Sequence, residues 1–159
     1  MTTPGPSPFL MYRLTVESPV GPLALESDGA ALTALRFGPG GAGELCPVLE
    51  ETRRQLEEYF SGRRREFDLP LTPRGTPFQQ AVWRALMTIP YGETAGYGEI
   101  AARIGNPRAC RAVGMANNRN PISIIIPCHR VVGADGSMVG YGGGLPIKEY
   151  LLKLEKGLL

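Results

Sequence analysis

Residues 97–117 read YGEIAARIGNPRACRAVGMAN, and this stretch decides the fold of the second half of the chain. The apolar spacing within 97–104 predicts a short helix, which Gly105 ends as a typical C-terminal glycine. An Asn-Pro pair at 106–107 predicts that a second helix begins there, with the asparagine as N-cap, and continues to about Asn117. Two short helices joined by so tight a turn indicate a helix-turn-helix.

The second of these helices is unusual in its small side chains, which are Ala109, Ala112, Gly114 and Ala116. Small residues let a helix approach another surface closely, and the pattern leaves open whether that surface is a neighbouring helix or a nucleic acid. Arg108 and Arg111 fall one turn apart on the predicted helix, where they suit phosphates or a base stack.

Two further helices are indicated in this half of the chain. Thr76 stands as an N-cap, Pro77 at the first helical position and Gln79 where a capping box requires Glu or Gln. An apolar face follows as far as Pro90, which would end the helix. A last helix is predicted to open at Leu145, and its apolar face consists of Ile147, Tyr150, Leu151 and Leu154.

The first third of the chain predicts a small sheet. Three short strands with short connections form an antiparallel meander, at 11–17, 22–26 and 31–37. A helical stripe follows over 48–60, and the end of 63–74 is expected to be a linker. We therefore predict an α+β protein with a sheet-and-helix domain over 1–74 and a helical domain with a helix-turn-helix over 75–159.

Composition limits the classes of function. No apolar run in the 159 residues approaches the roughly 18 that a membrane helix needs, and the amino terminus lacks the regions of a secretory signal. Three cysteines argue against a disulfide framework and favour a reducing cytosol. With one histidine and no close cysteine pair, we expect no metal site and no cofactor. The span 97–130 holds five Arg against one Glu, which fits a polyanion partner weakly and ordinary surface arginines equally well.

Residues 126–133, IPCHRVVG, place Cys128 beside His129, the single histidine of the chain, after an isoleucine run that predicts a buried strand. A thiol acts as a nucleophile only when ionised, so it needs a base, and His129 is the imidazole that can serve. Neighbours in a strand point to opposite faces, so a bend at 127–130 is required, and contact through a water is the easier geometry. An inert buried cysteine is the alternative; Cys46 and Cys110 are interpreted that way.

A base of this kind usually needs a third group to orient it, and Glu155 is the candidate. It lies near the carboxyl end of the last predicted helix, where a negative charge is locally unfavourable. The alternative is a solvated glutamate between Lys153 and Lys156.

The stretch from Pro127 to Val131, PCHRV, resembles the active-site signature of the O6-alkylguanine-DNA alkyltransferases, also called methylated-DNA–protein-cysteine methyltransferases. The segments GTPFQQAVWRALMTIPYGET, YGEIAARIGNPRACRAVG and NRNPISIIIPCHRVV match that family in order and spacing, so the resemblance covers roughly 50–159. It implies a ribonuclease-H-like N-terminal domain and a winged-helix-like C-terminal domain that carries the active-site cysteine.

The resemblance also implies roles for individual residues. Cys128 would accept the alkyl group irreversibly, once per molecule. His129 would deprotonate Cys128 through a water while Glu155 holds the imidazole. Asn120 would brace the turn before the active site, and Tyr141 would donate a hydrogen bond to the leaving guanine.

For DNA, the resemblance implies a recognition helix in the minor groove of a duplex, bound by a monomer in the cytoplasm, at the nucleoid. Tyr97 would crowd the target phosphate while Arg111 fills the gap left by the extruded base. Further DNA contacts would come from Arg108, Ala112, Gly114 and Arg130. The pocket for the base would be lined by Val131, Gly142, Gly143 and Met115.

Some features depart from the family or bear on its subclasses. Position 142 is glycine where many relatives carry serine, so a hydroxyl contact is absent although the backbone donor remains. The chain lacks the ligands of the zinc site that some relatives hold. Relatives that bind lesions without repairing them lack the cysteine, so Cys128 argues against that class.

Two other functions remain open from the residues alone. A cysteine hydrolase would use Cys128, His129 and Glu155 on an acyl substrate, with turnover, but it leaves the arginine-bearing helix unexplained. A DNA-binding module without chemistry would explain that helix and leave PCHRV unexplained.

Overall fold

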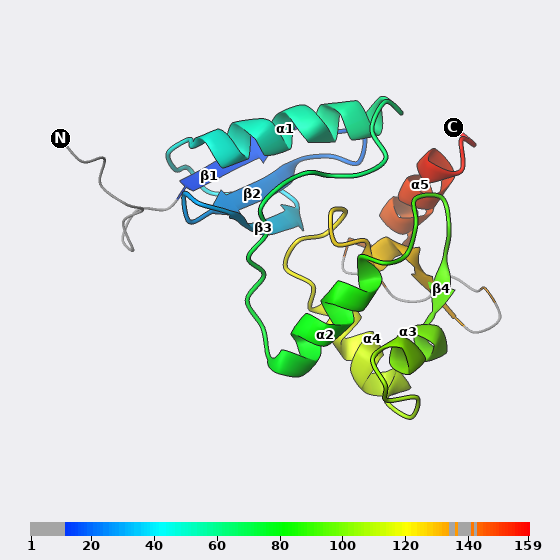
Figure 1. Cartoon of the computed structure of the whole chain (residues 1–159). Helices are drawn as coiled ribbons and strands as arrows, with labels where there is room; N and C mark the ends of the chain where they lie inside the picture. The colour runs from blue at the N-terminus through cyan, green and yellow to red at the C-terminus, as the bar shows by residue number, and fades with distance from the viewer. Residues whose placement is uncertain (1–11, 134–135, 137–140, 142) are drawn as a thin grey trace. The chain divides into compact units, whose positions relative to one another are not determined.

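The computed structural model of the chain describes residues 12–133, 136, 141 and 143–159 (Figure 1). The chain divides into two compact units, Met1–Pro73 and Arg74–Leu159. None of the helices within the described residues is long and apolar enough to cross a bilayer.

The N-terminal unit is the predicted antiparallel meander, in the order β1 (Tyr12–Val16), β2 (Leu23–Ser27) and β3 (Leu32–Phe37). Alternate residues of β2 are buried, which is the pattern of a sheet with one face against a core. Helix α1 (Pro47–Phe60) covers that face (Figure 1), with its buried stripe formed by Leu49, Thr52, Gln55, Leu56 and Tyr59.

Most of residues 63–74, whose end was predicted to be the linker, belongs to this unit. The amide of Gln55 donates to the carbonyl of Asp68 at 2.9 Å and accepts from the Asp68 N–H at 2.9 Å. Leu32 exchanges backbone hydrogen bonds with Pro70 and Thr72. These contacts tie the chain to α1 and β3 almost as far as the boundary between the units.

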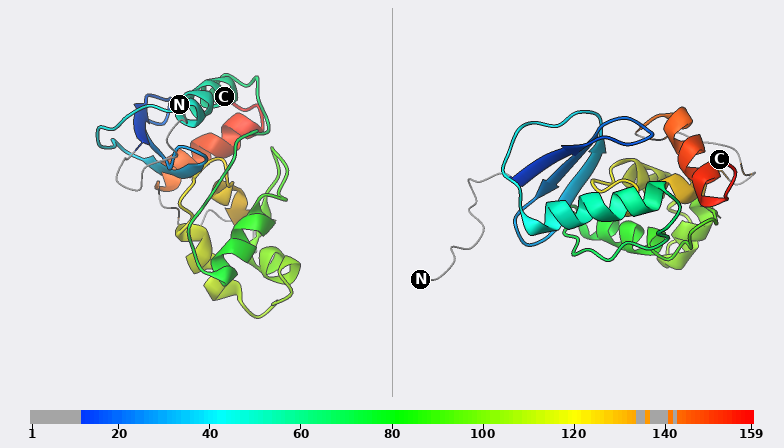
Figure 2. Two further views of the ribbon diagram at one scale, coloured as in Figure 1. Left: turned by 60° about the vertical axis from the view of Figure 1, so that its left-hand side comes forward. Right: turned by 90° about the horizontal axis from the view of Figure 1, so that it is seen from above.

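The C-terminal unit contains α2 (Pro77–Leu86), α3 (Tyr97–Arg103), α4 (Cys110–Asn118) and α5 (Leu145–Glu155). Helices α2, α3 and α4 pack together at one end of the unit, with α5 at the other (Figure 2). Trp83 of α2 is buried and its indole N–H donates to the carbonyl of Ala116 at 2.9 Å. Ala116 is therefore small because α4 packs closely on a neighbouring helix.

The ends of the helices agree with the capping signals in the sequence at most positions, but the end of α2 and the start of α4 differ from the prediction. The capping box of Thr76 and Gln79 is present as predicted, but α2 ends at Leu86, because residues 87–89 turn before Pro90 is reached. The prediction that Asn106 caps the next helix is wrong. Its N–H instead bonds the carbonyl of Ala101 at 2.9 Å and closes the end of α3 beyond a left-handed glycine, so α4 begins only at Cys110.

The expected buried strand over the isoleucine run is also wrong. Ile124, Ile125 and Ile126 are buried, but they form turns, and the N–H of Ile126 bonds the carbonyl of Ile122 at 3.0 Å. Ile124 has φ 72°, a left-handed conformation that is strained for a β-branched residue. The isoleucine run therefore predicted burial correctly but not the backbone, which turns tightly before Cys128 instead of extending as a strand.

A two-stranded parallel pairing, which the sequence did not predict, joins two segments far apart in the chain. Ala95 pairs with Val131 and Gly96 with Val132, as β4 (Ala95–Gly96) and β5 (Val131–Val132). This pairing brings the start of α3 beside the residues that follow η1 (Cys128–Arg130).

Candidate active site

Cys128 and His129 lie on a single turn of 3-10 helix, η1 (Cys128–Arg130), which packs against α2 and α5. This turn supplies the bend that two neighbouring side chains need in order to serve one site. Asn120 braces the approach to the turn, because its Oδ1 accepts from the N–H of Ile122 at 3.0 Å and its Nδ2 donates to the carbonyl of Ile126 at 2.8 Å. One amide thus closes the loop that leads to Cys128.

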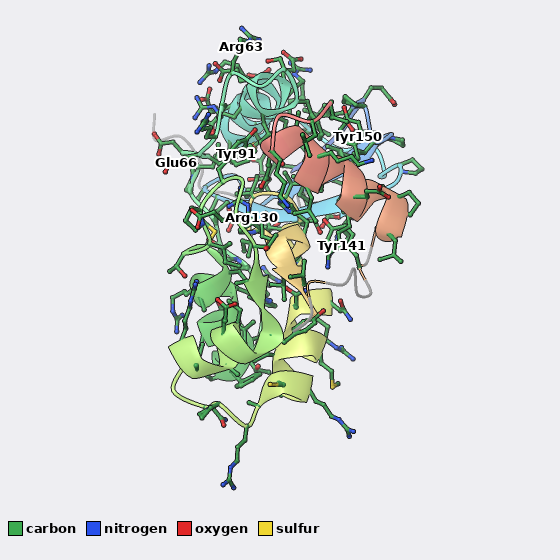
Figure 3. All side chains as sticks on the ribbon, turned by 90° about the vertical axis from the view of Figure 1, so that its right-hand side faces the viewer. Arg63, Glu66, Tyr91, Arg130, Tyr141 and Tyr150 are labelled. Carbon is green, nitrogen blue, oxygen red and sulfur yellow. The ribbon has the colours of Figure 1, made fainter. Side chains whose placement is uncertain are left out.

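Glu155 of α5 is buried and lies against this turn. Its Oε2 is 2.6 Å from Nε2 of His129. Arg130 binds the same carboxylate through Nε at 2.8 Å and Nη2 at 3.1 Å, and its Nη1 donates to the carbonyl of Ile89 at 2.7 Å. The guanidinium also lies 5.8 Å from the ring centroid of Tyr91 (Figure 3).

These contacts set the protonation of the site. The pKa of Glu155 is lowered well below its usual value although burial opposes this, because His129 and Arg130 both hydrogen-bond the ionised carboxylate. Burial lowers the pKa of His129, against the raising effect of Glu155. A carboxylate only accepts hydrogen bonds, so a neutral His129 carries its proton on Nε2 and leaves Nδ1 as an acceptor. Nδ1 is buried, with no protein partner among the described residues.

Cys128 is 4% exposed, and burial raises the pKa of its thiol. Hydrogen bonding to Asn120, Tyr141 and Ser123 acts in the opposite direction. A group with a raised pKa rests as the thiol at neutral pH, so the thiolate forms only when a base removes the proton. The acceptor nitrogen of the next residue, His129, is suited to that task.

Two residues from the helix-turn-helix, Tyr97 and Asn117, lie near Cys128, and a third, Gly114, contacts Tyr97. The sequence singled out Tyr97 and Gly114 but not Asn117. Tyr97 is half-buried at the start of α3, and burial together with the nearby Cys128 raises its pKa. Gly114 faces the Tyr97 ring, which a side chain at position 114 would meet at 3.7 Å, so this glycine provides room for the tyrosine. Asn117 is buried, and its Nδ2 lies 3.4 Å from the Cys128 carbonyl.

Met115, predicted to line the pocket for the base, lies on a different face of α4 from the residue that contacts Cys128. Met115 is 61% exposed, whereas Asn117, two residues further along α4, is the residue that contacts Cys128. A helix turns by about 100° per residue, so residues two apart lie on different faces. Asn117 was missed because a polar residue near the end of a helix resembles an ordinary exposed asparagine.

The prediction that Arg130 contacts DNA is wrong, since Arg130 is 7% exposed and all three of its side-chain nitrogens are bound inside the unit. Arg111 and Ala112 are exposed on α4. Arg108 is also exposed, but it lies in the turn before α4, so the two arginines do not share a helical face as predicted.

The remaining predicted residues surround the turn on its α5 side. The Val131 carbonyl accepts a hydrogen bond from Lys148 of α5 at 2.5 Å, and the Lys148 ammonium lies 6.0 Å from the ring centroid of Tyr141. Gly143 lies in the turn before α5. The predicted role of Gly142 falls outside the described residues.

Within the part of the chain that the structure describes, no three His, Cys, Asp or Glu side chains gather as a metal site requires.

Lys148 is the second residue of the site that the sequence did not reveal. The predicted apolar face of α5 was offset, because the buried residues are Lys148, Leu151, Leu152 and Glu155. A lysine and a glutamate seven residues apart lie on the same helical face, and that spacing is the signal that could have identified them.

Together these features define a class: a helix-turn-helix unit that holds a buried cysteine beside a histidine–carboxylate pair. Residues 77–157 match the family model described as 6-O-methylguanine DNA methyltransferase, DNA binding domain. Residues 11–73 match its companion, 6-O-methylguanine DNA methyltransferase, ribonuclease-like domain. The chain belongs to the 6-O-methylguanine DNA methyltransferase family.

Individual relatives agree with this assignment. The methylated-DNA–protein-cysteine methyltransferase of Methanosarcina acetivorans is 54% identical over 153 residues, which cover 91% of this chain and 98% of the relative. The protein of that name from Mycobacterium tuberculosis strain H37Rv is 51% identical over 162 residues, with 93% of each chain covered. The crystal structure of Mycobacterium tuberculosis OGT in complex with DNA superposes with a TM-score of 0.86 at 51% identity, covering 92% of this chain and 94% of that one.

Proposed function

We propose that this protein repairs DNA by transferring the alkyl group of O6-alkylguanine to its own Cys128, once per molecule. The observation that carries the proposal is the His129–Glu155 contact of 2.6 Å, which leaves the second imidazole nitrogen as an acceptor on the turn that holds the thiol. A buried thiol with an adjacent oriented base is the arrangement of an activated nucleophile.

The chemistry follows from these groups. The thiol proton of Cys128 passes to Nδ1 of His129, through a water, and the sulfur forms a bond to the alkyl carbon. The bond from that carbon to O6 breaks, and its electron pair leaves with the guanine, which is then protonated. Hydrogen-bond donors would meet the charge that develops on the base, and Tyr141 would be one of them. The thioether product is a poor alkyl donor, so the protein is consumed.

The approach to DNA rests on α3 and α4 of the C-terminal unit, which we assign as the DNA-binding and alkyl-acceptor domain. Ala112 and Arg111 are exposed on α4, so this helix can approach a minor groove closely with one cation at the surface. An alkyl group on O6 is out of reach within a duplex, so the nucleotide must be extruded. Arg111 would fill the gap, Tyr97 would crowd the phosphate, and one monomer would suffice.

The rival functions account for fewer of the contacts. A DNA-binding module has no use for a buried relay of Cys128, His129 and Glu155. A hydrolase would use the relay, but it gives α4 no role. The discriminating experiment is the intact mass of the protein after mixing with a duplex that carries O6-methylguanine. The proposal requires the gain of one methyl group on the Cys128 peptide and none on repeated exposure; released product with unmodified protein would contradict it.

The Arg111→Ala protein should lose about tenfold in the rate of repair of duplex DNA, because nothing stabilises the vacated stack. Its reaction with O6-methylguanine as a free base should be unchanged, since no extrusion is needed. Both rates are measured by methyl incorporation, with Arg119→Ala, an exposed arginine at the end of α4, as the control. Equal losses on the two substrates would remove Arg111 from extrusion.

The Tyr141→Phe protein should transfer the methyl group about 100-fold more slowly, because it loses a donor to the departing base and a hydrogen bond that favours the thiolate. DNA affinity should be retained. Single-turnover transfer and gel-shift binding are the measurements, and Tyr150→Phe on α5 is the matched control (Figure 3). An unchanged transfer rate would exclude Tyr141 from the leaving-group site.

A further inference from the structure

The buried face of α4 consists of Val113, Ala116 and a polar residue, Asn117. Asn117 is 1% exposed, and its Nδ2 lies 3.4 Å from the carbonyl oxygen of Cys128. A carbonyl only accepts hydrogen bonds, so the NH2 end of the amide must face it and Oδ1 must point the other way. Oδ1 is therefore a buried acceptor beside the active-site turn, and it has no donor among the described residues.

A second buried acceptor adjoins Cys128 in the same condition. Nδ1 of His129 has no donor within the described part of the chain, while Nε2 bonds Glu155. The thiol of Cys128 lies in that part of the chain and bonds neither acceptor directly. A buried acceptor without a donor destabilises the fold, so two of them beside one thiol require an explanation.

One water would satisfy all three groups. A buried water makes about three hydrogen bonds, and it offers two O–H donors as well as lone pairs that accept. Donation to Oδ1 of Asn117 and to Nδ1 of His129 uses both donors, and the thiol S–H of Cys128 can donate to the water oxygen. The two acceptors come from different segments, α4 and η1, so together they would fix the orientation of the water as well as its position.

We propose that Asn117 is a positioning residue that holds the water through which His129 deprotonates Cys128. This role rests on the proposed function, which needs such a water but assigns it no anchor besides His129. The thiol proton passes to the water while a proton of the water passes to Nδ1, so the water is regenerated with its other O–H still donated to Asn117. The products are a thiolate and an imidazolium that faces the Glu155 carboxylate. The helix assigned to DNA therefore also aligns the proton transfer.

This role gives Asn117 a dependence on pH that packing would not. Burial raises the pKa of the Cys128 thiol, so below that pKa the thiolate has to be made by His129 through the water. Above it the thiolate forms without help, and Asn117 has no proton transfer to align. Loss of Asn117 should therefore slow transfer at neutral pH and have little effect in alkali.

The groups that titrate nearby are common to the parent and to an Asn117 variant, so a comparison of the two cancels their effects. The charged residues of α2, α3 and α4 are exposed. The titratable and charged groups that face the thiol or the imidazole are Tyr97 on α3, Arg130 on η1, Tyr141 before α5, and Lys148 and Glu155 on α5.

The first test compares Asn117→Leu with Asn118→Leu, which changes the exposed neighbour on the same helix. Leucine is close to asparagine in size, and the Cys128 carbonyl keeps its hydrogen bond from the N–H of Val131. Single-turnover methyl transfer from a saturating O6-methylguanine duplex is followed from about pH 6 to about pH 10. Asn117→Leu should be about tenfold slower at neutral pH and should approach the parent in alkali. Asn118→Leu should match the parent throughout.

Two results of this test overturn the proposal. One is a loss of rate that is the same at every pH, because it would show that Asn117 only supports the packing of α4 on η1. The other is an unchanged rate at neutral pH in a folded Asn117→Leu protein, since the water would then be held without the amide.

A second measurement uses the parent protein and does not depend on the folding of the variant. A high-resolution crystal structure of the reduced protein should show a water within about 3.2 Å of both Oδ1 of Asn117 and Nδ1 of His129, and bonded to the sulfur of Cys128. A protein donor on either acceptor in place of that water contradicts the proposal. If the water is bonded to all three groups but the parent takes no methyl group from DNA, the proposed function fails and the water site stands.

Discussion

The Cys128→Ala protein will take up no methyl group from a duplex that carries O6-methylguanine, whatever the incubation time. The methyl group has no other acceptor in the proposed reaction, and a missing nucleophile cannot be replaced by orientation or binding. Intact mass spectrometry is the measurement. DNA affinity should stay within about twofold of the parent, because Cys128 is 4% exposed and the expected contacts come from α4.

Cys46→Ala is the matched control, since Cys46 is also a buried free cysteine but lies in the N-terminal unit. It should accept a methyl group at the parental rate. If Cys128→Ala loses DNA binding together with transfer while remaining folded, the thiol has a role in binding that the proposed mechanism does not contain. If it still gains a methyl group, Cys128 is not the acceptor.

The second large effect is expected from Glu155→Gln, on stability and on transfer together. The substitution leaves the buried guanidinium of Arg130 without its bidentate carboxylate. Breaking one side of a buried pair costs about 3–5 kcal/mol in the free energy of unfolding. The imidazole of His129 also exchanges its ionised acceptor for a neutral amide, which no longer stabilises the imidazolium that forms when His129 takes the thiol proton, so transfer should slow by about 100-fold.

The stability effect should depend on pH with a definite sign. The pKa of Glu155 is lower in the folded protein than its usual 4.5, so the carboxylate stabilises the fold above about pH 4.5 and loses that contribution as the pH falls. Urea unfolding should therefore show a large difference between parent and Glu155→Gln at pH 7 and a smaller one in acid. Glu149→Gln, which removes an exposed glutamate of α5, should be nearly neutral. A difference that is constant with pH would show that Glu155 acts by packing alone.

Local signals predicted the elements that depend on neighbouring residues. The capping box at Thr76 and Gln79, the meander of three strands and the glycine stop after α3 are each set within a few residues of chain. The start of α4 was mispredicted for a related reason. Asn106 fits both the end of one helix and the cap of the next, and the hydrogen bond back to Ala101 decided between them.

The sequence by itself determined that a thiol and an imidazole stand side by side, and that Glu155 was a candidate to hold the imidazole. Only the tertiary structure decided which charges face them. It placed Lys148 and Glu155 on one buried face of α5, turned Arg130 inward and brought Asn117 to the Cys128 carbonyl. The physical reason is that the burial of a charged side chain depends on partners from distant segments, and neither helical periodicity nor local motif records where those segments meet.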